Sequence, residues 1–177
     1  MATALVVLAA GMGTRMRSDR PKVLHEVAGA PLIAHALRAG RALEPERVVV
    51  VTGPEMEAVA AAAHEEWPEA GIAIQTERLG TAHAVGQAAP FLQDFAGDVV
   101  VLYGDTPFIR PETLTAMAEA RTESDVVVLG FEPADPGRYG RLVTEGDALL
   151  RIVEWKDATP EERAIRLCNS GVMAAPA

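Results

Sequence analysis

A group of glycines and cations near the N-terminus has the composition of a phosphate-binding loop. The apolar run 5–10 predicts a buried strand, and Gly11 and Gly13 follow it directly. Glycines let the backbone turn tightly and bring its N–H groups close to a ligand, and successive N–H groups form a concavity that favours anions. Arg15 and Lys22 add a planar guanidinium and a compact ammonium group. This stretch therefore predicts a phosphate site.

Asp105 is the second residue whose position points to chemistry. It follows Gly104 at the end of an apolar run over 98–103, which predicts another buried strand. A carboxylate in that place can hold Mg²⁺, an ion that keeps several water and phosphate oxygens as its other ligands. The alternative is a turn-forming aspartate, which is common before a Thr-Pro pair. Because a second strand end carries the predicted phosphate loop, we favour the metal role.

Two other nucleotide-binding loops fit the sequence less well. A dinucleotide-binding turn needs a third glycine and an acidic residue at the end of the second strand. Here Met16 holds the third glycine position, and the second predicted strand, 47–52, ends without a carboxylate. The Gly-x-x-x-x-Gly-Lys-Ser/Thr pattern of a P-loop is absent. For the glycines alone, a plain strand-to-helix turn with a surface arginine remains the alternative.

Alternating strand and helix patterns predict an α/β fold with a doubly wound, mostly parallel sheet. Right-handed crossovers would bring Gly11, Gln75 and Asp105 to one edge of this sheet, which is where such sheets bind ligands. From Pro133 onward the pattern changes to an irregular loop and a hairpin around residues 145–147. The further strands are expected at 72–75, 125–131, 141–144 and 149–153, and the helices at 31–43, 55–66, 81–89 (capped by Thr81) and 111–121.

The length and composition predict one globular domain. We expect a single domain over 1–177, with a core at 1–132 that carries the predicted phosphate site and a small β-rich, substrate-facing section at 133–177. The net charge of −9 argues against a nucleic-acid partner. The lone Cys168 excludes an intrachain disulfide, as is usual in a reducing cytoplasm. No run is long enough to suggest a membrane partner or a secretion signal, so a soluble, cytoplasmic protein is expected.

Several motifs together resemble those of the sugar-1-phosphate nucleotidyltransferase family. Within it, the closest resemblance is to the uridylyltransferase domain of the bifunctional bacterial enzymes that make UDP-N-acetylglucosamine. The resemblance covers essentially the whole chain and implies a Rossmann-like nucleotidyltransferase fold. The motifs are Leu8-Ala9-Ala10-Gly11-x-Gly13-Thr14-Arg15-Met16, Pro21-Lys22-Val23-Leu24, Gln75-x-x-x-x-Gly80-Thr81-Ala82-His83-Ala84, Tyr103-Gly104-Asp105-Thr106-Pro107, Tyr139-Gly140-Arg141, Val153-Glu154-x-Lys156-Asp157-Ala158 and Asn169-Ser170-Gly171.

This resemblance implies Mg²⁺-dependent transfer of UMP from UTP to N-acetylglucosamine 1-phosphate. The products would be pyrophosphate and UDP-N-acetylglucosamine, a precursor of the cell envelope. Arg15 would contact the departing β,γ-phosphates, Lys22 the α-phosphate region, and Asp105 the Mg²⁺. The implied nucleotide-binding residues are Leu8, Ala9, Ala10, Gly11, Gly13, Thr14, Lys22, Gln75, Gly80 and Thr81, and the implied sugar-binding residues are Tyr103, Gly104, Gly140, Glu154 and Asn169.

Two of these assignments have structural alternatives. The Gln75 amide offers a donor and an acceptor that match the imide edge of uracil, but a loop glutamine can equally bond to the backbone. Glu154 can equally form a salt bridge with Lys156 or Arg151. His83 is expected to serve in packing.

Some features depart from the family or leave other functions open. In the family the catalytic domain continues past the strand with Asn169, and a later asparagine is the second metal ligand, for which the sequence up to Ala177 has no counterpart. The hexapeptide repeats of an acetyltransferase β-helix are absent as well. The alternatives are a hexose-1-phosphate uridylyl- or thymidylyltransferase, a molybdenum-cofactor guanylyltransferase, a nucleotide-binding module without turnover and, more distantly, a dinucleotide-dependent oxidoreductase. A homo-oligomeric assembly is also left open.

Overall fold

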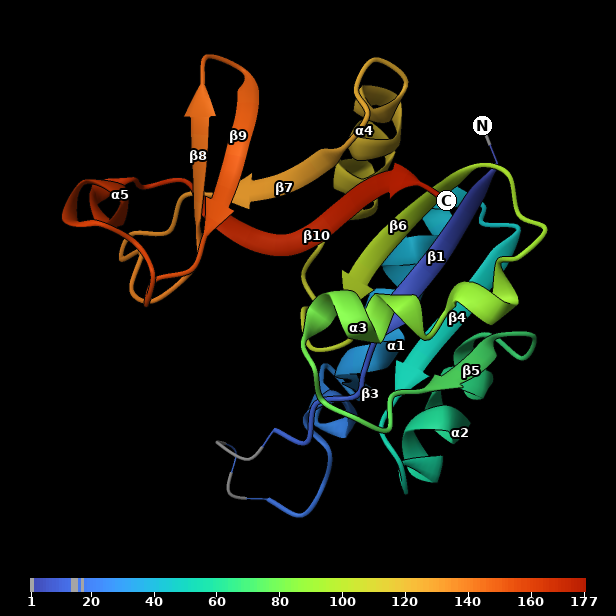
Figure 1. The fold of residues 1–177 in the computed structure, drawn as a ribbon. Coiled ribbons are helices and arrows are strands. Elements are labelled where there is room, and N and C mark those ends of the chain that lie inside the picture. Colours follow the sequence, from blue (N-terminus) through green and yellow to red (C-terminus); the bar gives the residue numbers. More distant parts are fainter. Residues whose placement is uncertain (1, 14–15, 17) are drawn as a thin grey trace. The chain divides into compact units, whose positions relative to one another are not determined.

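The structure, a computed structural model, describes residues 2–13, 16 and 18–177 (Figure 1). The chain forms two compact units, of which the first contains the residues up to Val127 together with Met173–Ala177, and the second contains Val128–Val172. The division expected from the sequence, at residue 132, had grouped 173–177 with the second part. In the structure these last residues pack in the first unit.

The first unit is built on a parallel sheet. Its strands lie in the order β5-β4-β1-β6, and each neighbouring pair in this order is parallel. The last residues of β10 continue the sheet beyond β6 in the antiparallel direction. Every residue of β1 is buried, as expected of a strand covered on both faces. The strands are β1 (Thr3–Leu8), β4 (Arg47–Thr52), β5 (Gly71–Ile74), β6 (Asp98–Tyr103) and β10 (Cys168–Pro176).

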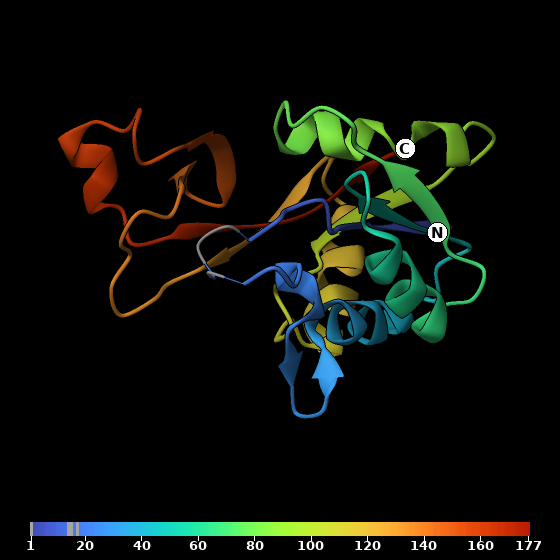
Figure 2. The ribbon, with the colours of Figure 1, turned by 90° about the horizontal axis from the view of Figure 1, so that it is seen from below.

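Helices cover both faces of this sheet, as Figure 2 shows. On one face lie α1 (Leu32–Gly40), α2 (Glu57–Glu66) and α4 (Pro111–Arg121). On the other face α3 (Thr81–Gly86) and the turn after it bury alanines against β1, β4 and β6. Burial of the apolar residues between the helices and the two faces of the sheet stabilises the unit, because removal of apolar area from water is the main favourable term in folding. The predicted doubly wound α/β class is therefore confirmed.

Several boundaries differ from the sequence-based expectation. The helix expected over 31–43 is α1 followed by a short 3₁₀ turn, η3 (Arg41–Leu43). Thr81 does not cap α3 but is its first residue, and Gly80 is the N-cap with φ +101°. The helix ends at Gly86 and is followed by the 3₁₀ turn η4 (Ala89–Phe91). A 3₁₀ turn, η2 (Lys22–Leu24), and a two-stranded ribbon, β2 (Glu26–Val27) and β3 (Ala30–Pro31), follow the predicted phosphate loop.

The second unit is rich in β-structure, as the sequence predicted for this part of the chain. It contains all of β7 (Val127–Phe131) except its first residue, the antiparallel pair β8 (Arg141–Glu145) and β9 (Ala148–Val153), the short α5 (Pro160–Ala164) and the first residues of β10. The predicted hairpin around 145–147 is confirmed, with Gly146 in the turn at φ +58°. Over the described ranges of both units, no helix has the length and apolarity needed to cross a membrane.

Candidate active site

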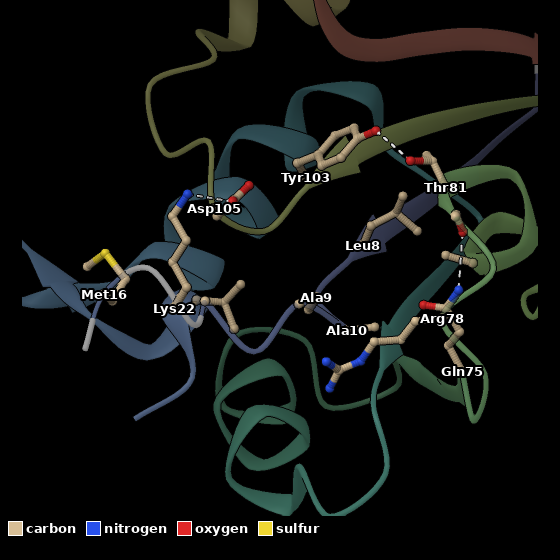
Figure 3. Close-up of a pocket in the computed structure, with 15 residues that line it drawn as sticks. Leu8, Ala9, Ala10, Met16, Lys22, Gln75, Arg78, Thr81, Tyr103 and Asp105 are labelled. Atoms are coloured by element: carbon tan, nitrogen blue, oxygen red, sulfur yellow. Dashed lines mark hydrogen bonds and ion pairs between the residues drawn. The ribbon is translucent and has the colours of Figure 1, made fainter. Parts of the chain in front are cut away.

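A pocket in the first unit lies where the carboxyl ends of the parallel strands meet. Gly11 follows β1, Gln75 follows β5 and Asp105 follows β6, and all three line this pocket, so the predicted convergence is confirmed (Figure 3). Its volume of about 620 Å³ is within the range of small-ligand sites. The lining residues are Leu8, Ala9, Ala10, Gly11, Gly13, Met16, Lys22, Val23, Gln75, Arg78, Gly80, Thr81, Ala84, Tyr103 and Asp105.

Lys22 and Asp105 form an ion pair at one side of the pocket. The Lys22 Nζ lies 2.7 Å from the Asp105 Oδ2, and both side chains remain partly exposed to solvent. Lys22 opens η2, whose next residues Val23 and Leu24 are buried and fix the turn in place. On the other side, Asp105 is held by the preceding Gly104, whose backbone N–H donates to the Leu8 carbonyl at 2.9 Å. The turn η2 thus presents the Lys22 cation, and the end of β6 presents the Asp105 carboxylate, to the same side of the pocket.

Gly13 is required by the geometry of the turn before Lys22. Its φ of +65° lies in the left-handed region, and a Cβ added to it would stand 2.6 Å from the Lys22 Cβ and 3.3 Å from the Lys22 backbone nitrogen. Side chains are disfavoured in that backbone conformation, and this approach leaves no room for a methyl group. The glycine therefore allows the loop to pass closely over the residue that pairs with Asp105.

Replacing Gly13 with alanine is expected to lower the free energy of unfolding by about 1–2 kcal/mol, from the left-handed backbone alone. The contact with Lys22 adds a displacement of that side chain and so weakens anion binding in the pocket. Denaturant unfolding measures the first effect. Gly11→Ala is the matched control, because a Cβ there meets no atom within 4 Å. Equal destabilisation by the two variants would contradict the role of the Gly13 backbone.

Gln75 lies at another side of the pocket with its amide held in place. Its side chain is buried, and the Nε2 donates to the Gly80 carbonyl at 3.2 Å and lies 3.2 Å from the His83 Nδ1. Gln75 thus bonds to the backbone, as the alternative interpretation held, but through its nitrogen, and its Oε1 has no partner among the described residues. His83 does more than pack, because it also fixes the orientation of this amide.

The aromatic ring of Tyr103 closes the same part of the pocket. Its hydroxyl donates to the Thr81 Oγ1 at 3.3 Å, which links the end of β6 to the first residue of α3 (Figure 3). Gly104, predicted for the sugar site, does not line the pocket. It packs instead between the Leu8 carbonyl and a Val23 methyl group, each 3.3 Å from where its Cβ would be.

Sequence reasoning missed four residues that line the pocket, Met16, Val23, Arg78 and Ala84. Val23 and Ala84 lie inside motifs quoted for the resemblance, but nothing in their spacing marks them as pocket residues. Arg78 lies in a loop already predicted between Gln75 and Gly80, where a charged side chain is usually solvated. The predicted residues Thr14 and Arg15 lie outside the residues that the structure describes.

Three of the residues predicted for the sugar meet within the second unit. The Asn169 backbone N–H donates to the Gly140 carbonyl at 2.9 Å, and the Asn169 Oδ1 accepts from the Gly171 N–H at 2.9 Å. A Cβ on Gly140 would be 3.3 Å from the Glu154 Oε1. The glycine therefore leaves room for the Glu154 carboxylate, while its carbonyl bonds to the Asn169 backbone.

Neither salt bridge considered for Glu154 is present. Arg151 pairs instead with Glu162, and the Lys156 Nζ is 3.9 Å from the Asp157 carboxylate. Glu162 also accepts from the Thr159 backbone N–H at 2.8 Å in a capping box at the start of α5. That backbone bond, with a smaller contribution from Arg151, lowers the pKa of Glu162 below its ordinary value. The Glu154 carboxylate has no ion pair among the described residues.

The donor set for a metal is small. Among the residues that the structure describes, no group of three or more histidine, cysteine, aspartate or glutamate side chains could hold a metal ion. Asp105 is the carboxylate of the pocket. This set fits Mg²⁺, which is usually bound by one or two carboxylates together with phosphate oxygens and water. It does not fit an ion that needs a closed cage of protein ligands.

A doubly wound parallel sheet with a glycine turn, a lysine and an aspartate at its carboxyl edge defines a nucleotide-binding domain of the nucleotidyltransferase class. The chain belongs to the family of MobA-like NTP transferase domains, whose model matches residues 5–166. This family membership agrees with the fold and with the position of the pocket.

The chain is also similar to individual curated proteins. It is 68% identical over 171 residues to the bifunctional protein GlmU of Cereibacter sphaeroides and 67% identical over 178 residues to that of Dinoroseobacter shibae. These matches cover 97% and 100% of this chain but 38% and 40% of the two relatives. The chain therefore spans about two fifths of the length of the relatives that it matches.

Solved structures share the fold at low sequence identity. A UDP-glucose pyrophosphorylase in complex with UDP-glucose matches with a TM-score of 0.80 and 18% identity, over 99% of this chain and 76% of that one. HddC from Yersinia pseudotuberculosis, in complex with GMP-PN, matches with a TM-score of 0.75 and 24% identity, over 98% of this chain and 76% of that one. These likenesses confirm the nucleotidyltransferase fold.

Proposed function

We propose that this chain is a uridylyltransferase domain that transfers UMP from UTP to N-acetylglucosamine 1-phosphate and releases pyrophosphate. The observation that carries the proposal is the pocket at the strand ends, with the Lys22–Asp105 pair at one side and the fixed Gln75 amide at another. The high identity to bifunctional GlmU proteins supports these substrates over those of other nucleotidyltransferases.

The base of the nucleotide is proposed to lie at Gln75. Its Nε2 donates to the Gly80 carbonyl and lies beside the His83 Nδ1, which leaves the Oε1 as an acceptor for the imide N–H of uracil. Cytosine has no hydrogen on the matching ring nitrogen, so this acceptor favours uracil over cytosine. Gly80 and Thr81 border the same space at the start of α3.

The triphosphate is proposed to lie along the glycine turn toward Lys22. The turn contributes backbone N–H groups suited to anions, and the Lys22 ammonium contributes a compact positive charge. Asp105 would hold Mg²⁺, which when bound neutralises phosphate charge and orients the phosphate oxygens. Arg15 remains the predicted contact of the departing β,γ-phosphates.

The reaction itself needs positioning more than covalent help. An oxygen of the sugar phosphate forms a bond to the α-phosphorus of UTP. The bond between that phosphorus and the oxygen that bridges the α- and β-phosphates breaks. Pyrophosphate leaves with the electron pair of that bond. Lys22 would stabilise the negative charge that spreads over the phosphoryl oxygens during this in-line transfer. A fixed cation of this kind acts without reorganising at the moment of reaction.

The sugar is proposed to bind the group formed by Gly140, Glu154 and Asn169 in the second unit. An unpaired carboxylate such as that of Glu154 can accept hydrogen bonds from sugar hydroxyls. A domain with these substrates would act in the cytoplasm and supply a precursor of the cell envelope.

Pyrophosphate release tests this function directly. The chain is incubated with UTP, Mg²⁺ and N-acetylglucosamine 1-phosphate, with glucose 1-phosphate as the sugar control and with CTP, GTP and dTTP as nucleotide controls. Release that depends on both UTP and the aminosugar phosphate is expected. Preference for glucose 1-phosphate or for GTP would indicate another nucleotidyltransferase, and UTP binding without release would indicate a nucleotide-binding module.

A further inference from the structure

Arg78 is a cation of the pocket that the mechanism above does not use. It lines the pocket from the loop between β5 and α3, and its side chain is exposed. Lys22, on the same pocket, is paired with Asp105 at 2.7 Å. Arg78 has no hydrogen bond or ion pair with any described residue, although Glu77 is next to it in the sequence. Its guanidinium is therefore free to meet a ligand.

The direction of the side chain favours a role in the pocket. Figure 3 shows Arg78 extending from the side of Gln75 in the direction of Ala10, along the pocket, whereas Lys22 and Asp105 lie at the other side. Arg78 also lies three residues after Gln75, within the loop that would surround the base. The loop that carries Arg78 therefore stands at the base end of the proposed nucleotide, and its guanidinium reaches toward Ala10, apart from the Lys22–Asp105 pair.

The residues at this end present two kinds of surface. Leu8, Ala9, Ala10 and Ala84 supply apolar groups, against which one face of a flat nucleobase can lie. The Gln75 amide addresses an edge of the base, which leaves the other face without a contact. A guanidinium is planar, weakly hydrated and able to stack on a π-system. Arg78 carries a guanidinium group, and its position in the loop beside Gln75 allows this group to reach the face of the base.

We propose that Arg78 stacks its guanidinium on the face of the nucleobase and so contributes to nucleotide affinity. The inference rests on the proposed function, because it takes the base to lie at Gln75. Stacking of this kind is attractive for any base, since every base has a π-face. Arg78 thus adds affinity, while the edge contacts of Gln75 choose the base.

The proposal is tested by calorimetry, which measures the affinity for Mg²⁺-UTP. The parent chain is compared with the variants Arg78→Met and Arg78→Lys. Methionine keeps the length without the charge or the plane, and lysine keeps the charge without the plane. Both variants are expected to bind UTP about tenfold more weakly, which is within the range of one stacking contact on a base. Arg110→Ala is the matched control, because Arg110 is an exposed arginine of the first unit that does not line the pocket. It should bind UTP as the parent does.

Binding of inorganic tripolyphosphate separates a contact to the base from a contact to the phosphates. Its affinity for Arg78→Met should stay within about twofold of the parent value, because charges beyond direct contact are screened by salt. Full UTP affinity in Arg78→Lys, or an equal loss for UTP and tripolyphosphate, would overturn the stacking role. Unchanged UTP binding by Arg78→Met would refute the inference alone, whereas a parent chain that binds no UTP would overturn the proposed function and this inference together.

Discussion

Replacing Lys22 with alanine is expected to lower the rate of pyrophosphate release by about a hundredfold or more, the usual effect of removing one group that stabilises transition-state charge. Its ammonium lies at the Asp105 side of the pocket, 2.7 Å from the carboxylate oxygen. Without the Lys22 ammonium, the repulsion between the negative charges of Asp105 and the phosphates is less well balanced. The loss should appear mainly in kcat, because spread charge in the transition state gains more from the cation than the ground state does.

The fold should survive this change. The side chains of Lys22 and Asp105 are 40% and 30% exposed, and ion pairs of such exposure contribute about 0–1 kcal/mol to stability. Denaturant unfolding of Lys22→Ala should therefore agree with that of the parent chain to within about 1 kcal/mol.

Arg20→Ala is the control for the Lys22 substitution. It removes a cation two residues away, whose guanidinium pairs with Glu26 at 3.1 Å on the surface. Steady-state rates of pyrophosphate release, measured over a range of UTP concentrations, compare the two variants with the parent. Turnover of Lys22→Ala within a few-fold of that of Arg20→Ala would show that Lys22 has no catalytic role.

Asp105→Asn is expected to lower the rate at saturating Mg²⁺ by about a hundredfold or more, and to raise the Mg²⁺ concentration needed for half of the maximal rate. Asparagine keeps the size of the side chain but removes the charge. Asp105 is the carboxylate among the described residues that line the pocket, so no other acidic group there can replace it.

Without metal, the same substitution should not weaken the binding of UTP, in contrast to its effect on the Mg²⁺-dependent rate. In the absence of Mg²⁺ the Asp105 carboxylate repels the triphosphate, and its Lys22 partner is engaged by the ion pair. Asp105→Asn should therefore bind metal-free UTP at least as tightly as the parent chain. Asp94→Asn is the control, since Asp94 is an exposed aspartate outside the pocket. Weaker metal-free binding by Asp105→Asn would contradict a metal-holding role and favour a purely structural one.

Much of the fold of the first unit could be predicted, because the signals are local. The strand over 98–103 and the helix over 111–121 have in the structure the bounds that the sequence predicted. A run of β-branched residues buried on both faces and a proline at the first helical position each act within a few residues of the chain. The edge shared by Gly11, Gln75 and Asp105 was also predictable, since right-handed crossovers fix which strand ends meet.

Other features could not be predicted in this way. The sequence predicted a cation at residue 22 and a carboxylate at residue 105, but not the ion pair between them, which joins residues 83 positions apart. The resemblance implied Gly104 as a sugar contact, but its close packing against the Leu8 carbonyl and Val23 could not be predicted. Arg78 lies in a loop, and its place at the pocket depends on how that loop packs.

The class of fold, the main strands and helices of the first unit and the composition of the predicted phosphate loop follow from the sequence alone, because hydrophobic periodicity, glycine and proline act through neighbouring residues. The pairing of Lys22 with Asp105, the contact of His83 with the Gln75 amide, and the contacts of Gly140 with Glu154 and Asn169 come from tertiary packing. These contacts join residues far apart in the chain, and their distances depend on how whole elements pack. Such contacts leave no periodic pattern in the sequence, so they can be seen only once the elements are packed.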